Sequence, residues 1–568
     1  MKQLVECVPN FSEGRDKDKI NDIVQKMSSV SGITVLDVDM GSDTNRTVVT
    51  IVGSPEAVGE AAFQGIKHAS EILDMAQHSG THPRMGATDV CPFIPVSGVS
   101  IDECIALSKE VGKRAGETLD IPIYLYEKSA QKSDRKKLPT IRKGEYEGLG
   151  EKLKDQNWKP DFGPAIMHVK AGATVMGCRE FLIAYNINLN TKDHRLATDI
   201  AFELREAGRS KRTPNPDSKN LLDGKIVRHE DGKPIKTPGM FKDVKGIGWY
   251  VEEFNRAQIS INFNNYKVST IHDVFDAACK LAEERGVRVT GSELVGLIPL
   301  EAILMAGKHY LKKQNRSLGV PTDQIIECAI QSLGLDDVTE FNPNEKIIDY
   351  AVGVEERPLM ALTGSAFIDE LSSNSPAPGG GSVSALAGSL GAALSSMVAA
   401  LTHEKKEMLS SKPEMDSIGS KAQKLKERLS FLVDKDTEAF NKVMSANRLL
   451  ATTEEEKREK TIAVELANKY AIDIPLETAE KSYRVIELAE MLVEKGNPNS
   501  VSDAGVAAEV ALAGVRGACM NVLINLPGIK DKTYISAKKE VVSKLVSDAE
   551  KLHKIVYEKT INTIESKR

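Results

Sequence analysis

The order in which strand and helix signals follow one another constrains this fold more than any other feature of the sequence. The first 96 residues show the order βαββαβ, with strand patterns at 2–8, 33–40, 46–53 and 90–96 and helix patterns at 16–29 and 55–77. A further helix (100–118) and strand (121–126) follow. From 181 to 299 the same βαββαβ order returns. Two such copies predict two ferredoxin-like subdomains side by side, with a ligand cleft between them.

Beyond Tyr350 the strand patterns disappear and helical periodicity takes over. The helix patterns cover 366–403, 415–446, 453–472, 476–495, 503–525 and 532–566. They predict an up-down helical bundle. The fold class is therefore an α+β N-terminal module followed by an all-α module. The predicted boundaries are 1–178 and 179–330 for the two subdomains, 331–365 for a linker and 366–568 for the bundle.

The composition favours a soluble cytoplasmic protein. Hydrophobic residues make up 41% of the chain and charged residues 27%, and the net charge of -6 argues against nucleic-acid binding. Seven cysteines without a CxxC motif indicate reduced thiols, not a disulfide framework or a thiolate zinc site. The N-terminus shows no signal-peptide pattern. The uncharged stretch 371–402 places large apolar residues on one face and small ones on another, which predicts a buried helix and no membrane span.

The segment His78–Val96 concentrates polar chemistry directly before a strand. His82 precedes Pro83, so its backbone is restricted to an extended conformation. Imidazole can take and give a proton near neutral pH, and Arg84 can hold a carboxylate through two N–H groups. The alternative is that His78 and His82 are polar loop residues that cap the preceding helix. The sequence contains neither HExxH nor a cysteine pair, so we expect no metal.

Further polar positions follow the predicted strands. Asn10 comes after the first strand and Asp39 lies at the end of the second, and each alone is also compatible with ordinary turn chemistry. Glycines flank the segment Gly163–Gly172, where a flat ligand could approach the backbone. The segment Ser210–Lys242 is rich in Pro, Gly and Lys, and we expect a long loop or hairpin over the cleft, in the position of a lid.

In the helical module, Asp436 falls on an apolar stripe. The stripe includes Leu425, Leu429 and Leu432, and a carboxylate at the next position would be desolvated and have a raised pKa. A general acid needs this property. The alternative is a helix break at 433–436 that exposes Asp436. The glycines of SPAPGGGS lack the GK[ST] of a phosphate loop, so they indicate a helix start near a ligand and not a nucleotide site.

Long motifs in both modules resemble one known family. ECVPNFSEG (6–14), HPRMGATDVCPFIPV (82–96), FLIAYNINL (181–189), KGIGWY (245–250) and GSELVGLIP (291–299) resemble the formiminotransferase domain. APGGGSVSAL (377–386), LVDKDTEAF (432–440), SDAGVAA (502–508) and MNVLINL (520–526) resemble the cyclodeaminase domain. The chain therefore resembles the bifunctional formiminotransferase–cyclodeaminases over nearly its whole length.

This resemblance implies two reactions of histidine breakdown. The first moves the formimino group of N-formimino-L-glutamate to N5 of tetrahydrofolate, a co-substrate that is polyglutamylated. The second closes 5-formimino-tetrahydrofolate to 5,10-methenyl-tetrahydrofolate with release of ammonia. The family also implies a homo-oligomer with dimerising cyclodeaminase domains, with no metal, nucleic acid or membrane involved.

The resemblance also assigns residues. His82 is the acid/base of the transfer and Asp436 the proton donor of the cyclisation. Folate contacts fall on two segments, which comprise Gly163, Pro164, Ala165, Ile166, Met167, His168, Val169, Lys170, Ala171 and Gly172, then Gly239, Met240 and Phe241. Asn10, Asp39 and Arg84 are our added candidates for substrate binding. The sequence leaves open an N-formyl-glutamate donor with methenyl-tetrahydrofolate cyclohydrolase chemistry, and a non-enzymatic folate-binding scaffold.

Overall fold

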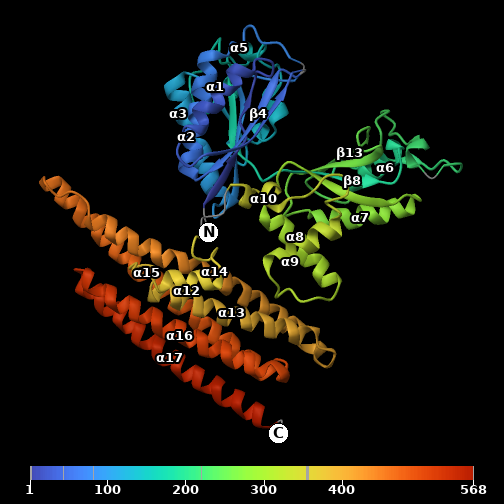
Figure 1. Cartoon of the computed structure of the whole chain (residues 1–568). Helices are drawn as coiled ribbons and strands as arrows, with labels where there is room; N and C mark the ends of the chain where they lie inside the picture. The colour runs from blue at the N-terminus through green and yellow to red at the C-terminus, as the bar shows by residue number, and fades with distance from the viewer. Residues whose placement is uncertain (1–2, 43, 81, 219, 353–356, 567–568) are drawn as a thin grey trace. The chain divides into compact units, whose positions relative to one another are not determined.

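The chain forms two compact units in a computed structural model that describes residues 3–42, 44–80, 82–218, 220–352 and 357–566. The first unit comprises Met1–Ala306 and Leu333–Val354, and the second Gly307–Ser332 and Glu355–Arg568. The first unit is a mixed α/β region and the second is helical, as the sequence predicts. Figure 1 shows the sheets of the first unit in blue to green and the long helices of the second in yellow to red.

The N-terminal part of the first unit is built on a seven-stranded sheet. Its strands are β1 (Leu4–Cys7), β2 (Asn10–Phe11), β3 (Thr34–Gly41), β4 (Arg46–Gly53), β5 (Thr88–Ser97), β6 (Ile123–Glu127) and β7 (Thr174–Cys178). β1 and β2 each pair antiparallel with both β4 and β5. The two short strands therefore occupy a single strand position, which lies between β4 and β5. β3 extends the sheet beyond β4, whereas β7 and β6 follow β5 in parallel. The sequence analysis missed β7.

The two faces of this sheet differ in what they bury. Helices α1 (Lys17–Ser28), α2 (Pro55–Ile72) and α3 (Ile101–Leu119) cover one face (Figure 1) and form a core with Phe11, Cys91 and Phe93. The opposite face buries Val90 and other apolar residues against the short helices α4 (Leu138–Arg142) and α5 (Leu149–Lys152). Paired residues on neighbouring strands share a face. Asn10 pairs with both Val48 and Val90, and Asp39 with Val48, so Asn10 and Asp39 lie on the face opposite α1–α3.

The second sheet of this unit repeats the central strand order of the first. Its strands β8 (Ile183–Leu189), β13 (Val244–Val251), β14 (Arg256–Phe263) and β15 (Val289–Val295) have the antiparallel order β13-β14-β8-β15. The first sheet contains the equivalent order β3-β4-β1/β2-β5. The helices of this part are α6 (His194–Leu204) and α7 (Ile271–Glu284), and α8 (Leu300–Lys313) begins in it and ends in the second unit. The two sheets therefore share a four-strand order.

The segment 210–242 forms nested two-stranded ladders. Strand β9 (Arg209–Ser210) pairs with β12 (Lys236–Thr237), and inside them β10 (Arg212–Thr213) pairs with β11 (Lys225–Ile226). The predicted hairpin is present, and its role as a lid stays a prediction. The predicted linker 331–365 contains α10 (Pro343–Lys346) and α11 (Ile348–Ala351), and its residues 353–356 lie outside the described part of the chain.

The second unit consists of long helices. They are α9 (Thr322–Leu333), α12 (Gly364–Leu371), α13 (Gly380–Glu404), α14 (Lys412–Asn447), α15 (Glu454–Lys495), α16 (Val501–Asn525) and α17 (Lys532–Glu565). Two predictions are wrong. The pattern 366–403 is split into α12 and α13 by the Pro- and Gly-rich turn, and the two helices predicted at 453–472 and 476–495 are one helix, α15, which continues through Pro475.

Helices α13 and α16 are long and apolar enough to cross a membrane, but about half of each apolar window is buried inside the bundle. They are core helices, as predicted for α13. Small residues allow the close approach: a Cβ on Gly388 would lie 2.3 Å from the Ser482 hydroxyl of α15, and one on Gly514 of α16 would lie 2.9 Å from it. Larger side chains at these positions would separate the helices.

Candidate active sites

His82 lies in the loop between α2 and β5 and is half-buried. Its Nδ1 is 2.7 Å from the carbonyl oxygen of Pro83, which can only accept, so Nδ1 carries the proton. The Nε2 lone pair then remains for a substrate. Burial, followed by the nearby Arg46 and Arg142, lowers the pKa of His82 below its ordinary value. The imidazole is therefore neutral near pH 7 and able to accept a proton.

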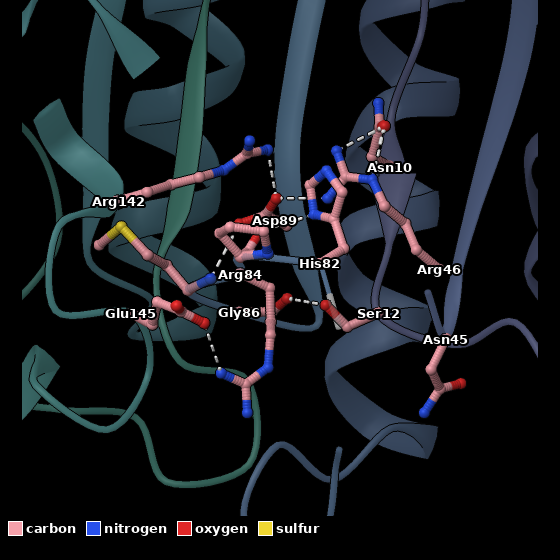
Figure 2. Close-up of polar contacts among 12 residues, drawn as sticks. Asn10, Ser12, Asn45, Arg46, His82, Arg84, Gly86, Asp89, Arg142 and Glu145 are labelled. Atoms are coloured by element: carbon pink, nitrogen blue, oxygen red, sulfur yellow. Dashed lines mark hydrogen bonds and ion pairs between the residues drawn. The ribbon is translucent and has the colours of Figure 1, made fainter. Parts of the chain in front are cut away.

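A buried carboxylate joins two arginines beside His82 (Figure 2). The Asp89 side chain is fully buried and accepts from Arg46 at 2.6 Å and from Arg142 at 2.5 Å, while the Met85 backbone N–H donates to its other oxygen at 2.8 Å. Asn10 accepts from Nε and Nη2 of Arg46. The structure thus places Asn10, Arg46 and Asp89 beside the predicted His82, together with Arg142, which the sequence analysis missed. The sequence does not mark Arg142 as functional, because it lies in a polar stretch without a motif around it.

Arg84 is a buried residue whose guanidinium is occupied by residues of the chain itself. It makes a two-pronged contact with Glu147 (2.6 and 2.8 Å), a bond to Glu145 (3.2 Å) and two bonds to His78. The bond to Glu147 raises the pKa of Arg84. A substrate carboxylate would have to displace these partners. An open pocket of about 470 Å³ is lined by His78, Arg84, Glu145, Glu147 and nearby glycines.

His78 is fixed in one tautomer. Its Nε2 lies 2.9 Å from the carbonyl oxygen of Asn45 and must donate, and its Nδ1 accepts from Arg84 Nε at 3.2 Å. Both ring nitrogens are therefore in use. The two imidazoles of this loop differ: His78 holds Arg84 in place, whereas no side-chain or backbone group of the described residues bonds Nε2 of His82.

The predicted folate segment Gly163–Gly172 ends against the chain that follows His82. The Ala87 N–H donates to the carbonyl oxygen of Ala171 (2.8 Å) and the Ala173 N–H to that of Met85 (3.1 Å). Gly172 has φ +66°, and a Cβ there would lie 2.1 Å from the Met85 oxygen, so only glycine fits. Earlier in the segment, Ile166 and Val169 are 72% and 63% exposed. Exposed apolar side chains are therefore present in this segment, whose end is bonded to the chain that follows His82.

The second predicted folate segment lies with the other sheet. Met240 N–H donates to the carbonyl oxygen of Glu203 and Phe241 N–H to that of Leu204, so Gly239–Phe241 runs along the end of α6. Met240 is 58% exposed. Asp39, the remaining substrate candidate, is exposed on β3, and none of the described residues bonds its side chain.

Asp436 lies in the uninterrupted helix α14, so the predicted alternative of a helix break is wrong. Its carboxylate approaches the first turn of α13, where Ser382 Oγ is 3.3 Å away, and a Cβ on Gly381 would lie 2.0 Å from Oδ1. Burial raises the pKa of Asp436 above its ordinary value, and the opposing bonds from Ser382 do not cancel this effect. The neighbouring Asp434 accepts from the Leu359 N–H at 2.8 Å. Asp436 is thus the carboxyl group suited to donate a proton.

Each unit thus holds one group suited to proton transfer, a neutral imidazole in the α/β unit and a buried carboxyl group in the helical unit, as a bifunctional enzyme would require. Comparison with protein families agrees. The formiminotransferase domain, N-terminal subdomain, matches residues 4–179, the formiminotransferase domain matches 184–353, and the formiminotransferase-cyclodeaminase family matches 363–544.

Relatives match the full length. The formimidoyltransferase-cyclodeaminase of Rattus norvegicus is 42% identical over 552 residues, which cover 97% of both chains. That of Dictyostelium discoideum is 41% identical over 561 residues, which cover 98% of both. The methenyltetrahydrofolate cyclohydrolase of Methylorubrum extorquens is 38% identical over 201 residues, 35% of this chain and 95% of that protein. This chain belongs to the formimidoyltransferase-cyclodeaminase family.

Proposed function

We propose that this chain catalyses two successive steps of folate-dependent histidine degradation. N-formimino-L-glutamate and tetrahydrofolate give 5-formimino-tetrahydrofolate and L-glutamate in the first step. In the second, 5-formimino-tetrahydrofolate gives 5,10-methenyl-tetrahydrofolate and ammonia. The observation that carries this proposal is the pair of opposite acid–base groups in the two units: a neutral imidazole at His82 and a buried carboxyl at Asp436.

His82 is the proton shuttle of the transfer. As N5 of tetrahydrofolate attacks the formimino carbon, Nε2 takes the N5 proton, because Nδ1–H is held by the Pro83 carbonyl. The same proton then passes to the glutamate nitrogen as its bond to the formimino carbon breaks. Asn10 and Asp39 are candidates for holding the donor, and Gly163–Gly172 and Gly239–Phe241 for holding folate.

Asp436 is the proton donor of the cyclisation. N10 attacks the formimino carbon, and its proton passes to the former imino nitrogen. That nitrogen takes a further proton from Asp436 and leaves as ammonia, which gives cationic 5,10-methenyl-tetrahydrofolate and the Asp436 carboxylate. A neutral carboxyl group is required at the start of this step, and burial of Asp436 supports that state. The absence of a side chain at Gly381 leaves room for the Asp436 carboxyl group against the first turn of α13.

The proposal includes the architecture around these sites. The shared four-strand order supports two ferredoxin-like subdomains in the first unit. Seven free cysteines support a reducing, cytoplasmic environment. We further propose a homo-oligomer with dimerising helical domains, polyglutamylated tetrahydrofolate as co-substrate and no metal requirement.

The cyclohydrolase similarity of the helical unit favours a second candidate function for that unit. In this reading the unit interconverts 10-formyl- and 5,10-methenyl-tetrahydrofolate by adding or removing water. Supplying 5-formimino-tetrahydrofolate and measuring ammonia decides between them. Release of one ammonia for each 5-formimino-tetrahydrofolate consumed supports the cyclodeaminase. Interconversion of 10-formyl- and 5,10-methenyl-tetrahydrofolate without ammonia release supports the cyclohydrolase.

Two single variants test the assignment of the sites. We expect His82→Ala to stop formimino transfer and to spare cyclisation of supplied 5-formimino-tetrahydrofolate. Asp436→Asn should stop cyclisation and spare transfer. Loss of both activities in either folded variant would contradict two separate sites. A non-enzymatic folate-binding scaffold predicts instead that both variants leave cellular function intact.

A further inference from the structure

The group beside His82 carries an excess of positive charge. Two guanidinium groups, from Arg46 and Arg142, share the single carboxylate of Asp89. The arginine side chains are only 11% and 12% exposed and that of Asp89 is 0% exposed. Both arginines act to lower the pKa of His82, so their charge reaches the imidazole. A half-buried site with one uncompensated positive charge is suited to bind an anion.

Arg142 has N–H groups to spare. One of its N–H groups donates to Asp89, and among the described residues the others have no recorded partner; its Nε is buried and unbonded. Arginine has five N–H groups arranged to bind carboxylates in pairs. Arg84 is the contrasting case, because all of its N–H groups have partners in the chain. Of these two arginines, Arg142 is therefore the one with capacity for a ligand.

Arg46 is held rigidly and completes the site. Asn10 accepts from two of its nitrogens at 3.1 and 2.7 Å, and Asp89 accepts from a third at 2.6 Å. Figure 2 shows the guanidinium groups of Arg46 and Arg142 on either side of the His82 ring, both directed toward Asp89. An anion that reaches them would lie next to the proton-transfer group.

We propose that Arg142, with Arg46, binds the α-carboxylate of N-formimino-L-glutamate. This inference rests on the proposed function. The α-carboxylate is two bonds from the nitrogen that His82 must protonate, so a donor placed for reaction brings it close to the imidazole. The glutamyl carboxylates of folate lie beyond the p-aminobenzoyl ring, far from N5. The carboxylate that Arg142 and Arg46 can bind beside His82 therefore belongs to N-formimino-L-glutamate and not to folate.

The main test compares the two substrates in the full-length enzyme. We expect Arg142→Gln to raise the KM for N-formimino-L-glutamate about 10- to 100-fold, the effect of losing a charge-assisted pair. The KM for tetrahydrofolate should change less than about threefold, and the inhibition constant for L-glutamate should rise in parallel with the donor KM. An unchanged donor KM would overturn the proposal. So would an equal or larger rise in the tetrahydrofolate KM, which would assign the site to a folate carboxylate.

Matched variants separate binding from folding. Arg114→Gln removes an exposed arginine that is paired with Glu60 and should leave both KM values unchanged. Arg142→Lys keeps the charge and should raise the donor KM less than Arg142→Gln does; an equal rise would overturn the role of charge. Cyclisation of supplied 5-formimino-tetrahydrofolate reports the integrity of each variant. If the wild-type enzyme shows no transfer activity, the proposed function itself is wrong. If the wild type is active and the Arg142→Gln variant has an unchanged KM for N-formimino-L-glutamate, only this inference is wrong.

The pH profile gives a readout that a purely structural role would not change. Arg142 acts to lower the pKa of His82, so its removal should shift the acid limb of kcat/KM for transfer to higher pH. Arg114→Gln should leave that limb in place. A limb that does not move in Arg142→Gln would show that the guanidinium charge does not act on the imidazole, and would overturn the assignment.

Discussion

At the scale of single residues, burial acts in the same direction on both proposed catalytic groups. In each case desolvation is the largest influence, and it favours the neutral form. A neutral histidine is a base, and a neutral aspartic acid is an acid. His82 and Asp436 are thereby prepared for opposite proton transfers by one physical effect. The residues around them differ: arginines reinforce the effect at His82, whereas Ser382 opposes it at Asp436.

The two activities should therefore respond to pH in opposite directions. Transfer needs neutral His82, so its kcat/KM should rise with pH through a pKa below 6.5 and be flat at neutral pH. Cyclisation needs protonated Asp436, so its rate should fall as pH rises through a pKa above 3.8. Each profile is measured with its own supplied substrate. A transfer rate that falls between pH 6 and 8, or a cyclisation rate that rises there, would contradict these protonation states.

The Asp436 carboxylate can lie against α13 because Gly381 has no side chain. Its Cβ in an alanine variant would lie 2.0 Å from Oδ1, so Gly381→Ala must displace the carboxyl group. A displacement of about 1 Å at a catalytic group lowers rates by about 100-fold, and we expect a loss of this order in cyclisation with transfer unchanged. Gly364→Ala, where no atom lies within 4 Å, is the matched control. Equal cyclisation in both variants would argue against a fixed carboxylate position.

At the scale of elements, α15 shows how a helix continues through a proline. Pro475 cannot donate to the carbonyl oxygen of Ala471, four residues earlier. The side chain of Asn525, at the end of α16, donates to that oxygen at 2.8 Å. A long-range bond thus replaces the missing helical one. This explains why the pattern around Pro475 predicts two helices while the structure has one.

We expect Asn525→Ala to destabilise the protein by about 1–3 kcal/mol, because the Ala471 carbonyl loses its partner. Pro475→Ala restores a backbone N–H to that oxygen, so the cost of Asn525→Ala should be smaller in a Pro475→Ala background. Chemical denaturation of the four proteins of this cycle measures the coupling. Additive effects of the two substitutions would contradict the replacement bond.

The same distinction between local and long-range causes decides what the sequence could predict. The order of strands and helices along the chain follows from local periodicity, and Asp436 is visible because a carboxylate interrupts an apolar stripe. His82 is marked by its proline and by the family motif. Arg142 and Asp89 meet only because α4 folds against β5, and β7 is too short and too uniformly buried to show alternation. Those features depend on contacts between distant residues, which no single segment records.

At the scale of the whole molecule, the compact units do not follow the order of the chain. The segment Gly307–Ser332 lies between two parts of the first unit in sequence, but it packs within the helical unit. The Leu318 N–H donates to Asp416 at 2.9 Å, and Ser396 Oγ donates to the carbonyl oxygen of Gly319 at 3.0 Å. A Cβ on Gly419 of α14 would lie 2.8 Å from the Gly319 Cα. Two glycines thus allow the loop before α9 to lie directly on α14.

This contact predicts that Gly419→Leu releases the loop before α9 without unfolding α14, because leucine is a good helix former but has no space against Gly319. Overpacking of this kind costs about 1–3 kcal/mol, so backbone amides from 316 to 322 should exchange with solvent about 5- to 150-fold faster. Lys421→Leu places the same side chain at an exposed position of α14 and should leave this exchange unchanged. Hydrogen–deuterium exchange on the full-length chain measures both. Unchanged exchange in Gly419→Leu would show that the loop is held by its other bonds, and equal acceleration in Lys421→Leu would show that the effect arises in α14 itself.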